Sequence, residues 1–222
     1  MSETNCAPRD DAKGEEASPP GGASRVDERA GLAARDLITV AIFGAIYVVI
    51  TYLLGMIGVF GPLAWMISVL VTVLVNGITF MLFYARVRRA GMVLLLSVIL
   101  ALAFLLHGGA LVGALAAPVV GLGAELVARS GRYASRASGI GACTVFGLTA
   151  FVPFLPMLVD RESYFRSAAW QSMGADYVRA AEQVFTVPMM LALAVACLVA
   201  GLLGGLLGAA VLRKHFVRAG LA

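Results

Sequence analysis

Charged residues are scarce over most of this sequence. They make up 14% of the 222 residues, whereas 60% are hydrophobic and the mean hydropathy is +0.91. Soluble domains average about 25% charged residues. Eight of the 13 acidic residues lie within the first 36 positions, so the remainder is an apolar body interrupted by short, mostly basic gaps. This composition excludes an ordinary soluble domain and is typical of an integral membrane protein.

Motifs that carry catalysis are also missing. The sequence contains no Walker A loop, no H-E-x-x-H, no G-x-S-x-G and no C-x-x-C. Its three cysteines give no disulfide framework. Cys143 and Cys197 lie inside apolar segments, where cysteine acts as a small hydrophobe. We therefore expect no enzymatic activity, no metal site and no cofactor, and any ATP hydrolysis must come from a partner protein.

The N-terminal segment differs from the rest of the chain. Residues 1–34 are rich in Asp, Glu, Ser, Gly and Pro, and they include no aromatic residue. Such a segment buries too little apolar surface to offset its ordering entropy, and it lacks the apolar stretch of a signal peptide. We predict a disordered cytoplasmic tail over residues 1–34 and one transmembrane domain over residues 35–222.

Six apolar segments follow this tail. A helix needs about 20 residues to cross a hydrocarbon core of about 30 Å, and inside lipid a helix satisfies its own backbone groups. The sequence therefore predicts an all-α fold, a polytopic bundle of six transmembrane helices, of which the third is the shortest. The expected helices run over residues 37–56, 63–84, 92–106, 110–128, 138–159 and 185–212.

Basic residues predict the orientation of the bundle. Fourteen of the 17 lie in the tail, in the gaps after the second and fourth segments, and after the sixth. Only Arg161, Arg166 and Arg179 remain for the other side, where acidic residues accompany them. Because cytoplasmic loops carry the excess of Lys and Arg, we expect both termini in the cytoplasm.

The expected outer face holds the candidate substrate-binding residues. It consists of the turn at 58–62, the His-Gly-Gly turn at 107–109 and the segment at 160–182. The aromatic residues of that last segment form either an interfacial belt or part of an interfacial helix that caps a substrate pocket. The residues selected for the pocket are Phe60, His107, Tyr164, Trp170 and Tyr177.

Glu125 is the exceptional ionisable residue within the apolar segments. A charge at the bilayer centre costs about 2.5–3.5 kcal/mol, and less near a helix end. Its position four residues before Arg129 predicts an ion pair at the interface. A proton relay is the alternative, but relays usually use several intramembrane carboxylates.

Small residues recur at four-residue spacing in three of the segments. The stripes are Gly201, Gly204, Gly205 and Gly208 in the last segment, Gly109, Gly113, Ala117 and Gly121 in the fourth, and Ala41 and Ala45 in the first. Such stripes let helix backbones approach closely in lipid, where packing drives association. Each stripe predicts packing within the bundle, and docking of a separate protein on Ala41 and Ala45 is the alternative.

The sequence resembles the Trep_Strep, or MptD-like, family of substrate-binding (S) components of energy-coupling factor (ECF) transporters. The resemblance covers residues 33–222. It rests on ARDLITVAIFGAIYVVI (34–50), on Asn76-Gly77-Ile78 and on GLLGGLLGAAVLRKHFVRAGLA (201–222). Its most specific piece is the last helix running into Leu212-Arg213-Lys214-His215-Phe216.

This resemblance implies a transport function. S components are six-helix bundles in the bacterial cell membrane that capture a micronutrient from outside. They then associate with a coupling membrane protein and two cytoplasmic ATPases. In related S components an A-x-x-x-A motif on the first helix contacts the coupling protein, and Ala41 and Ala45 match this motif. The substrate is expected to be vitamin-like, or a tetrapyrrole bound near His107 or Met56.

Three other functions are alternatives for such a chain. A stand-alone secondary carrier is disfavoured by the scarcity of intramembrane carboxylates and by the absence of an obvious inverted repeat. An intramembrane enzyme is disfavoured by the lack of paired catalytic residues at one depth. A noncatalytic membrane scaffold differs from a transport component in having neither ATPase partners nor a bound small molecule.

Overall fold

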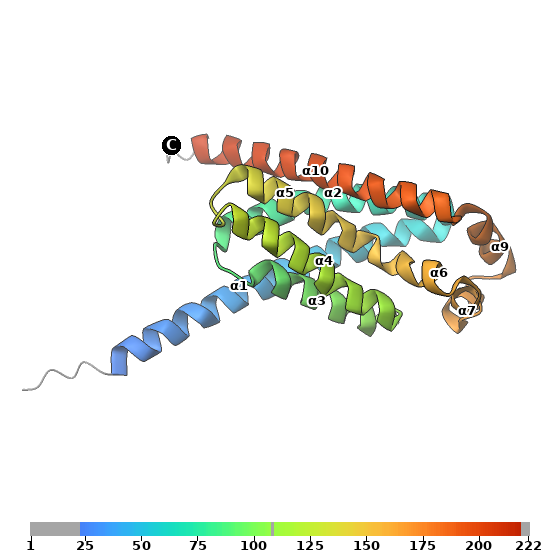
Figure 1. Cartoon of the computed structure of the whole chain (residues 1–222), viewed down its shortest axis with the longest axis horizontal. Helices are drawn as coiled ribbons and strands as arrows, with labels where there is room; N and C mark the ends of the chain where they lie inside the picture. Colours follow the sequence, from blue (N-terminus) through green and yellow to red (C-terminus); the bar gives the residue numbers. More distant parts are fainter. Residues whose placement is uncertain (1–22, 108, 219–222) are drawn as a thin grey trace, which may run out of the picture. The chain divides into compact units, whose positions relative to one another are not determined.

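The computed structural model describes residues 23–107 and 109–218, and the regular elements in this part of the chain are all helices (Figure 1). Contacts divide the chain into two units, Met1–Arg35 and Asp36–Ala222. The helices are α1 (Ala23–Gly55), η1 (Met56–Phe60), α2 (Pro62–Arg86), α3 (Met92–Leu106), α4 (Leu111–Ser130), α5 (Arg136–Phe146), η2 (Gly147–Ala150), η3 (Val152–Phe154), α6 (Leu155–Val159), α7 (Arg161–Phe165), α8 (Ala168–Gln171), α9 (Ala175–Val184) and α10 (Val187–Arg218).

The tail expected to be disordered is helical in its last third. Residues 1–22 lie outside the described residues, but α1 begins at Ala23, so the expected disorder does not extend over residues 23–34. This stretch has no proline and contains four Ala and two Arg residues, which favour helix over coil. Helix propensity therefore outweighs the low apolar content of this stretch.

Five helical stretches are long and apolar enough to cross a membrane. They are Asp36–Phe60, Pro62–Arg86, Leu111–Ser130, Arg136–Val159 and Val187–Lys214. The third expected span forms α3, whose 15 residues fall short of that length. At 1.5 Å per residue this helix is about 22 Å long, less than a hydrocarbon core of about 30 Å. Five of the six expected spans therefore have the length to cross.

The fifth span is not one continuous α-helix. After α5 the backbone tightens into η2 and η3 before α6 completes the span. Pro153 and Pro156 lie in this broken part, and a proline has no N–H to donate within a helix. The following segment, expected as an interfacial aromatic belt or an interfacial helix, forms the three short helices α7, α8 and α9. Gly174, with φ of 93°, provides the turn between α8 and α9.

Glycines hold α10 directly against α2 and α5, which run beside it in Figure 1. A methyl group on Gly77 of α2 would lie 2.6 Å from the Cα of Gly204, so only glycine fits this contact. On the neighbouring face of α10, a methyl group on Gly201 would lie 2.9 Å from the carbonyl oxygen of Thr144 in α5. The glycine stripe of α10 therefore packs inside the bundle on two sides.

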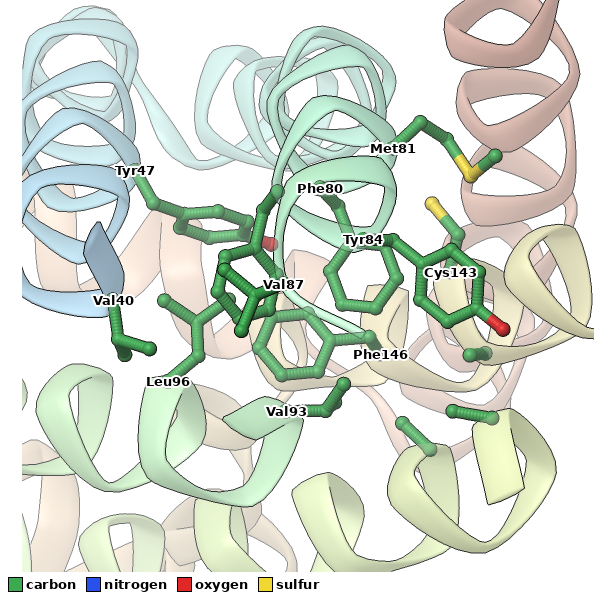
Figure 2. Close-up of a cluster of buried hydrophobic side chains, with 14 residues drawn as sticks. Val40, Tyr47, Phe80, Met81, Tyr84, Val87, Val93, Leu96, Cys143 and Phe146 are labelled. Atoms are coloured by element: carbon green, nitrogen blue, oxygen red, sulfur yellow. The ribbon is translucent and has the colours of Figure 1, made fainter. Parts of the chain in front are cut away.

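Buried aromatic side chains join α1, α2 and α5 (Figure 2). The rings of Tyr47 and Phe146 meet edge to face at 5.7 Å, and those of Phe80 and Phe146 lie 4.9 Å apart. Val40 and Leu96 extend the same cluster over α1 and α3. Edge-to-face and offset rings at these distances add about 0.5–1.5 kcal/mol per pair beyond their buried area.

Glu125 caps α3, and the predicted ion pair with Arg129 is not formed among the described residues. Its carboxylate accepts hydrogen bonds from the backbone N–H groups of Gly91 (2.6 Å), Val93 (3.0 Å) and Leu94 (3.3 Å). The Tyr133 hydroxyl donates a fourth, at 2.5 Å. The first-turn N–H groups of a helix have no partners within it and attract negative charge, so the carboxylate binds there. Burial and the bond to Glu125 raise the pKa of Tyr133 to about 12.

Candidate functional site

Aromatic side chains from distant segments gather where α2 begins and α10 begins, beneath α7, α8 and α9. The Trp65 ring lies 4.8 Å from that of Phe154 and 5.7 Å from those of Trp170 and Phe185. Phe165 lies 4.8 Å from Trp170. We call these five residues, with Tyr164 and Tyr177, the aromatic cluster. Figure 1 shows α7 and α9 at the end of the bundle away from the C-terminal end of α10.

Three of the five residues predicted for the pocket meet in this cluster. Trp170 is only 4% exposed, and the rings of Tyr164 and Tyr177 lie 5.8 and 6.1 Å from it. Phe60, at the end of η1, is 88% exposed. His107 is also exposed, and its ring lies 4.4 Å from the Tyr52 ring of α1, tilted by 47° to it. The structure therefore does not bring Phe60 and His107 into the cluster.

Two tyrosine hydroxyls tie the covering segment to the bundle. The hydroxyl of Tyr177 in α9 donates to the carbonyl of Gly58 in η1, at 2.7 Å. The hydroxyl of Tyr164 in α7 donates to the carbonyl of Pro153 in η3, at 3.3 Å. Burial raises the pKa of both tyrosines, so each stays a protonated donor near neutral pH. These bonds close α7–α9 over the cluster.

Charges at this end are balanced locally. Arg166 pairs with Glu162 at 2.5 Å, and Arg179 pairs with Asp176 at 2.5 Å. Arg161 lies over the Phe165 ring, 5.7 Å from its centroid, and donates to the carbonyl of Glu182. Asp160 caps α7 by accepting a hydrogen bond from Ser163 N–H, and bonding to Ser163 lowers its pKa. The surroundings of the cluster therefore carry little net charge.

The chemistry available at the cluster is stacking. Within the described residues, no three His, Cys, Asp or Glu side chains lie close enough together to hold a metal ion. The rings already touch one another, so a ligand enters only by displacing one of them. Flat, apolar or aromatic molecules are the ligands that such rings hold, through offset or edge-to-face contact.

The small residues of α1 form a second candidate site. Ala41 and Ala45 are exposed, whereas Gly44 between them is buried, and a methyl group there would lie 3.1 Å from the Ile99 side chain of α3. In the most apolar stretch of this span 17% of residues are buried, against 39–50% in the other four. We call the exposed side of α1 around Ala41 and Ala45 the alanine face. Its two alanines stay exposed in the described chain.

Comparison with known proteins places the chain in a family. The model of a family described as hypothetical bacterial integral membrane proteins, Trep_Strep, matches residues 34–218. This range includes nearly all of the described helical domain. The chain belongs to the Trep_Strep family. Neither the curated proteins nor the solved structures contain a match to it.

Membership of the Trep_Strep family shows that the environment of this protein is a membrane. The protein is a bacterial multi-pass integral membrane protein, so its exposed apolar side chains contact lipid or another membrane protein rather than water. Ala41 and Ala45 are part of that surface.

Sequence reasoning missed four residues of this Trep_Strep site: Trp65, Phe154, Phe165 and Phe185. Trp65 and Phe185 lie at the starts of the second and sixth apolar segments. Both could have been found from the sequence, because each is an aromatic residue at a segment end that the predicted topology places on the same side of the membrane. Phe154 gave none, because its position depends on the broken helix around Pro153 and Pro156.

Proposed function

We propose that this Trep_Strep protein is the substrate-binding component of an ECF-type importer. In this proposal six helices span the cell membrane with both termini in the cytoplasm. The chain captures a vitamin-like or tetrapyrrole micronutrient at the outer face. It then delivers the substrate through a coupling membrane protein that two ATPases drive. It binds and releases substrate without catalysing a reaction itself.

The alanine face is the observation that carries this proposal. A small-residue stripe that packs inside a bundle needs no partner, as the glycines of α10 show. Ala41 and Ala45 have the same four-residue spacing but lie exposed in a membrane protein. Lipid chains pack no better against small residues than against large ones, whereas a partner helix can bring its backbone close to them. A coupling protein that binds here and later dissociates fits this small, shallow contact.

The distribution of charge supports the orientation. Arg88, Arg136 and Arg213 lie at the ends of three spans away from the aromatic cluster. At the cluster end Arg166 and Arg179 pair with nearby acids, and Arg161 lies over the Phe165 ring. By the positive-inside rule the cluster faces outward and the unpaired arginines face the cytoplasm. A substrate arriving from outside therefore meets the aromatic cluster first.

The aromatic cluster favours a planar substrate. Its rings offer apolar faces and two protonated tyrosine hydroxyls. A flat heterocycle would stack on Trp170 or Trp65 and accept a hydrogen bond from Tyr177 once α9 moves away from Gly58. In the closed arrangement described here, the protein's own rings fill this position.

Recovery of partners from native membranes tests the proposal. The tagged wild-type chain, extracted in mild detergent, is expected to bring down a coupling membrane protein and two ATPases. Ala45→Trp places a large ring on the alanine face and is expected to lose all three. Ala192→Trp is the matched control, because Ala192 is an exposed alanine on α10, and this variant is expected to retain the partners.

Two results would contradict the proposal. If the folded wild-type chain recovers no ATPase, a solitary carrier or a membrane scaffold becomes the better account. If Ala45→Trp and Ala192→Trp retain the partners equally, the partners bind elsewhere and the alanine face has another role.

A further inference from the structure

A basic pocket lies at the opposite end of α2 from the aromatic cluster. It has a volume of about 270 Å³ and lies between α2, α10 and the connection from α4 to α5. Arg88, Arg136 and Arg213 line it, and each comes from a different segment of the chain. Folding thus brings together three cations that are far apart in sequence.

These three arginines have no acidic partner in the described part of the chain. The ion pairs found there involve Arg89, Arg166 and Arg179 instead. Glu125 lies at the same end of the bundle, but its oxygens accept hydrogen bonds from the first turn of α3 and from Tyr133. Three guanidinium groups around one cavity repel one another unless an anion lies between them.

The start of α5 adds hydrogen-bond donors to the same pocket. Ser135 and Arg136 line it, and Ser135 is the N-cap residue of α5. The Ser135 side chain accepts no hydrogen bond from the first turn of α5. The N–H groups of that turn are therefore available to an outside acceptor, and the positive end of the helix dipole favours an anion there.

The depth of the pocket in the membrane identifies the source of the anion. Arg136 begins one span, Arg213 lies one residue before the end of another, and Arg88 lies two residues beyond a third. This level corresponds to the lipid headgroups. The remaining lining includes Met81 and Leu212, apolar residues of the spanning helices α2 and α10. A phospholipid fits both parts, with its phosphate at the arginines and its glycerol and acyl chains along the apolar wall.

We propose that the basic pocket binds the phosphate of an acidic membrane phospholipid. Arginine suits this role because its planar guanidinium holds phosphate oxygens in pairs. Lipid binding joins the C-terminal end of α10 to α2 and α5. The proposal does not depend on the transport function.

Native mass spectrometry of the purified full-length chain tests this binding. The chain is stripped of native lipid and incubated with dioctanoyl-phosphatidylglycerol, dioctanoyl-phosphatidylcholine or inorganic phosphate. We expect the phosphatidylglycerol complex to dominate. The triple variant Arg88→Gln, Arg136→Gln and Arg213→Gln is expected to weaken it about a hundredfold, since each basic residue near the surface contributes about fivefold.

A second triple variant separates the pocket from general positive charge. Arg86→Gln, Arg129→Gln and Lys214→Gln removes three charges at the same end from exposed residues that do not line the pocket. We expect it to retain wild-type binding. The single variant Arg136→Gln, expected to weaken binding about fivefold, gives the result if the first triple variant does not fold.

Three outcomes would overturn the proposal. Equal loss of phosphatidylglycerol in both triple variants would mean diffuse attraction to surface charge. Equal binding of phosphatidylcholine would mean that the negative headgroup is not recognised. Inorganic phosphate that binds as strongly as the lipid, and is lost in the first triple variant, would assign the pocket to a soluble phosphate compound instead.

Discussion

Two small-residue stripes with the same spacing occupy opposite positions in this protein. On α10, Gly204 packs against the backbone of Gly77 in α2, inside the bundle. On α1, Ala41 and Ala45 lie on the outer surface. The spacing places residues on one side of a helix in both cases, and it predicts close approach of a second helix. Only the fold decides whether that second helix belongs to the same chain.

The difference between the stripes also has a steric basis. A methyl group on Gly77 would approach the α10 backbone to 2.6 Å, so glycine is required at this contact. The alanine face already carries two methyl groups and leaves the α1 backbone partly covered. Permanent packing within a chain tolerates the tightest contact. Under the proposed function, a partner that binds and dissociates is better served by a shallower contact.

The largest expected effect is on the internal stripe. Gly77→Leu forces α2 and α10 apart, because the new side chain meets backbone that cannot rotate away. We expect it to lower the unfolding free energy by about 3 kcal/mol or more, measured by denaturant titration in mixed micelles. Val75→Leu, at an exposed position of the same helix, is the control and should stay within about 0.5 kcal/mol of wild type.

A smaller effect is expected where α1 faces the bundle. Gly44→Leu crowds the Ile99 side chain, which can partly move aside because it is flexible. We expect a loss of about 1–3 kcal/mol in the same titration. A wild-type value for Gly44→Leu would show that α1 is held less tightly than its contacts with α3 indicate.

The smallest effect on stability is expected at Ala45, the residue after Gly44. Ala45→Leu adds the same side chain as Gly44→Leu but on the exposed side of α1, so the unfolding free energy should change by no more than about 0.5 kcal/mol. Under the proposed function, partner recovery should nevertheless fall, and Ala45→Gly should preserve it. A large loss of stability in Ala45→Leu would mean that Ala45 packs against the chain itself.

The helical composition and most segment boundaries followed from hydropathy alone. The third segment was predicted over residues 92–106, and α3 has these bounds. The breaks in the fifth span coincide with Pro153 and Pro156, because proline removes a backbone donor. The helix α3 is nevertheless shorter than a full membrane span. At residues 23–34 low hydrophobicity suggested disorder, but helix propensity favours a helix there.

The candidate sites were less accessible to sequence reasoning. Tyr164, Trp170 and Tyr177 were selected as outer aromatic residues and do meet, but Trp65, Phe154 and Phe185 join them through folding. His107 was selected for its depth in the membrane, yet its ring contacts that of Tyr52 instead. The depth of a residue in the membrane follows from its position along a span. Its neighbours in the bundle depend instead on how the helices pack.

Sequence by itself determined which segments are apolar helices, where their ends lie and which ends carry positive charge, because each property depends on residues close together in the chain. The tertiary structure alone decided the partners of each helix face. It turned the stripe of α10 inward and that of α1 outward. It also placed Glu125 on the first turn of α3 rather than beside Arg129. These outcomes depend on contacts between distant segments, where steric fit and unsatisfied backbone groups outweigh local spacing.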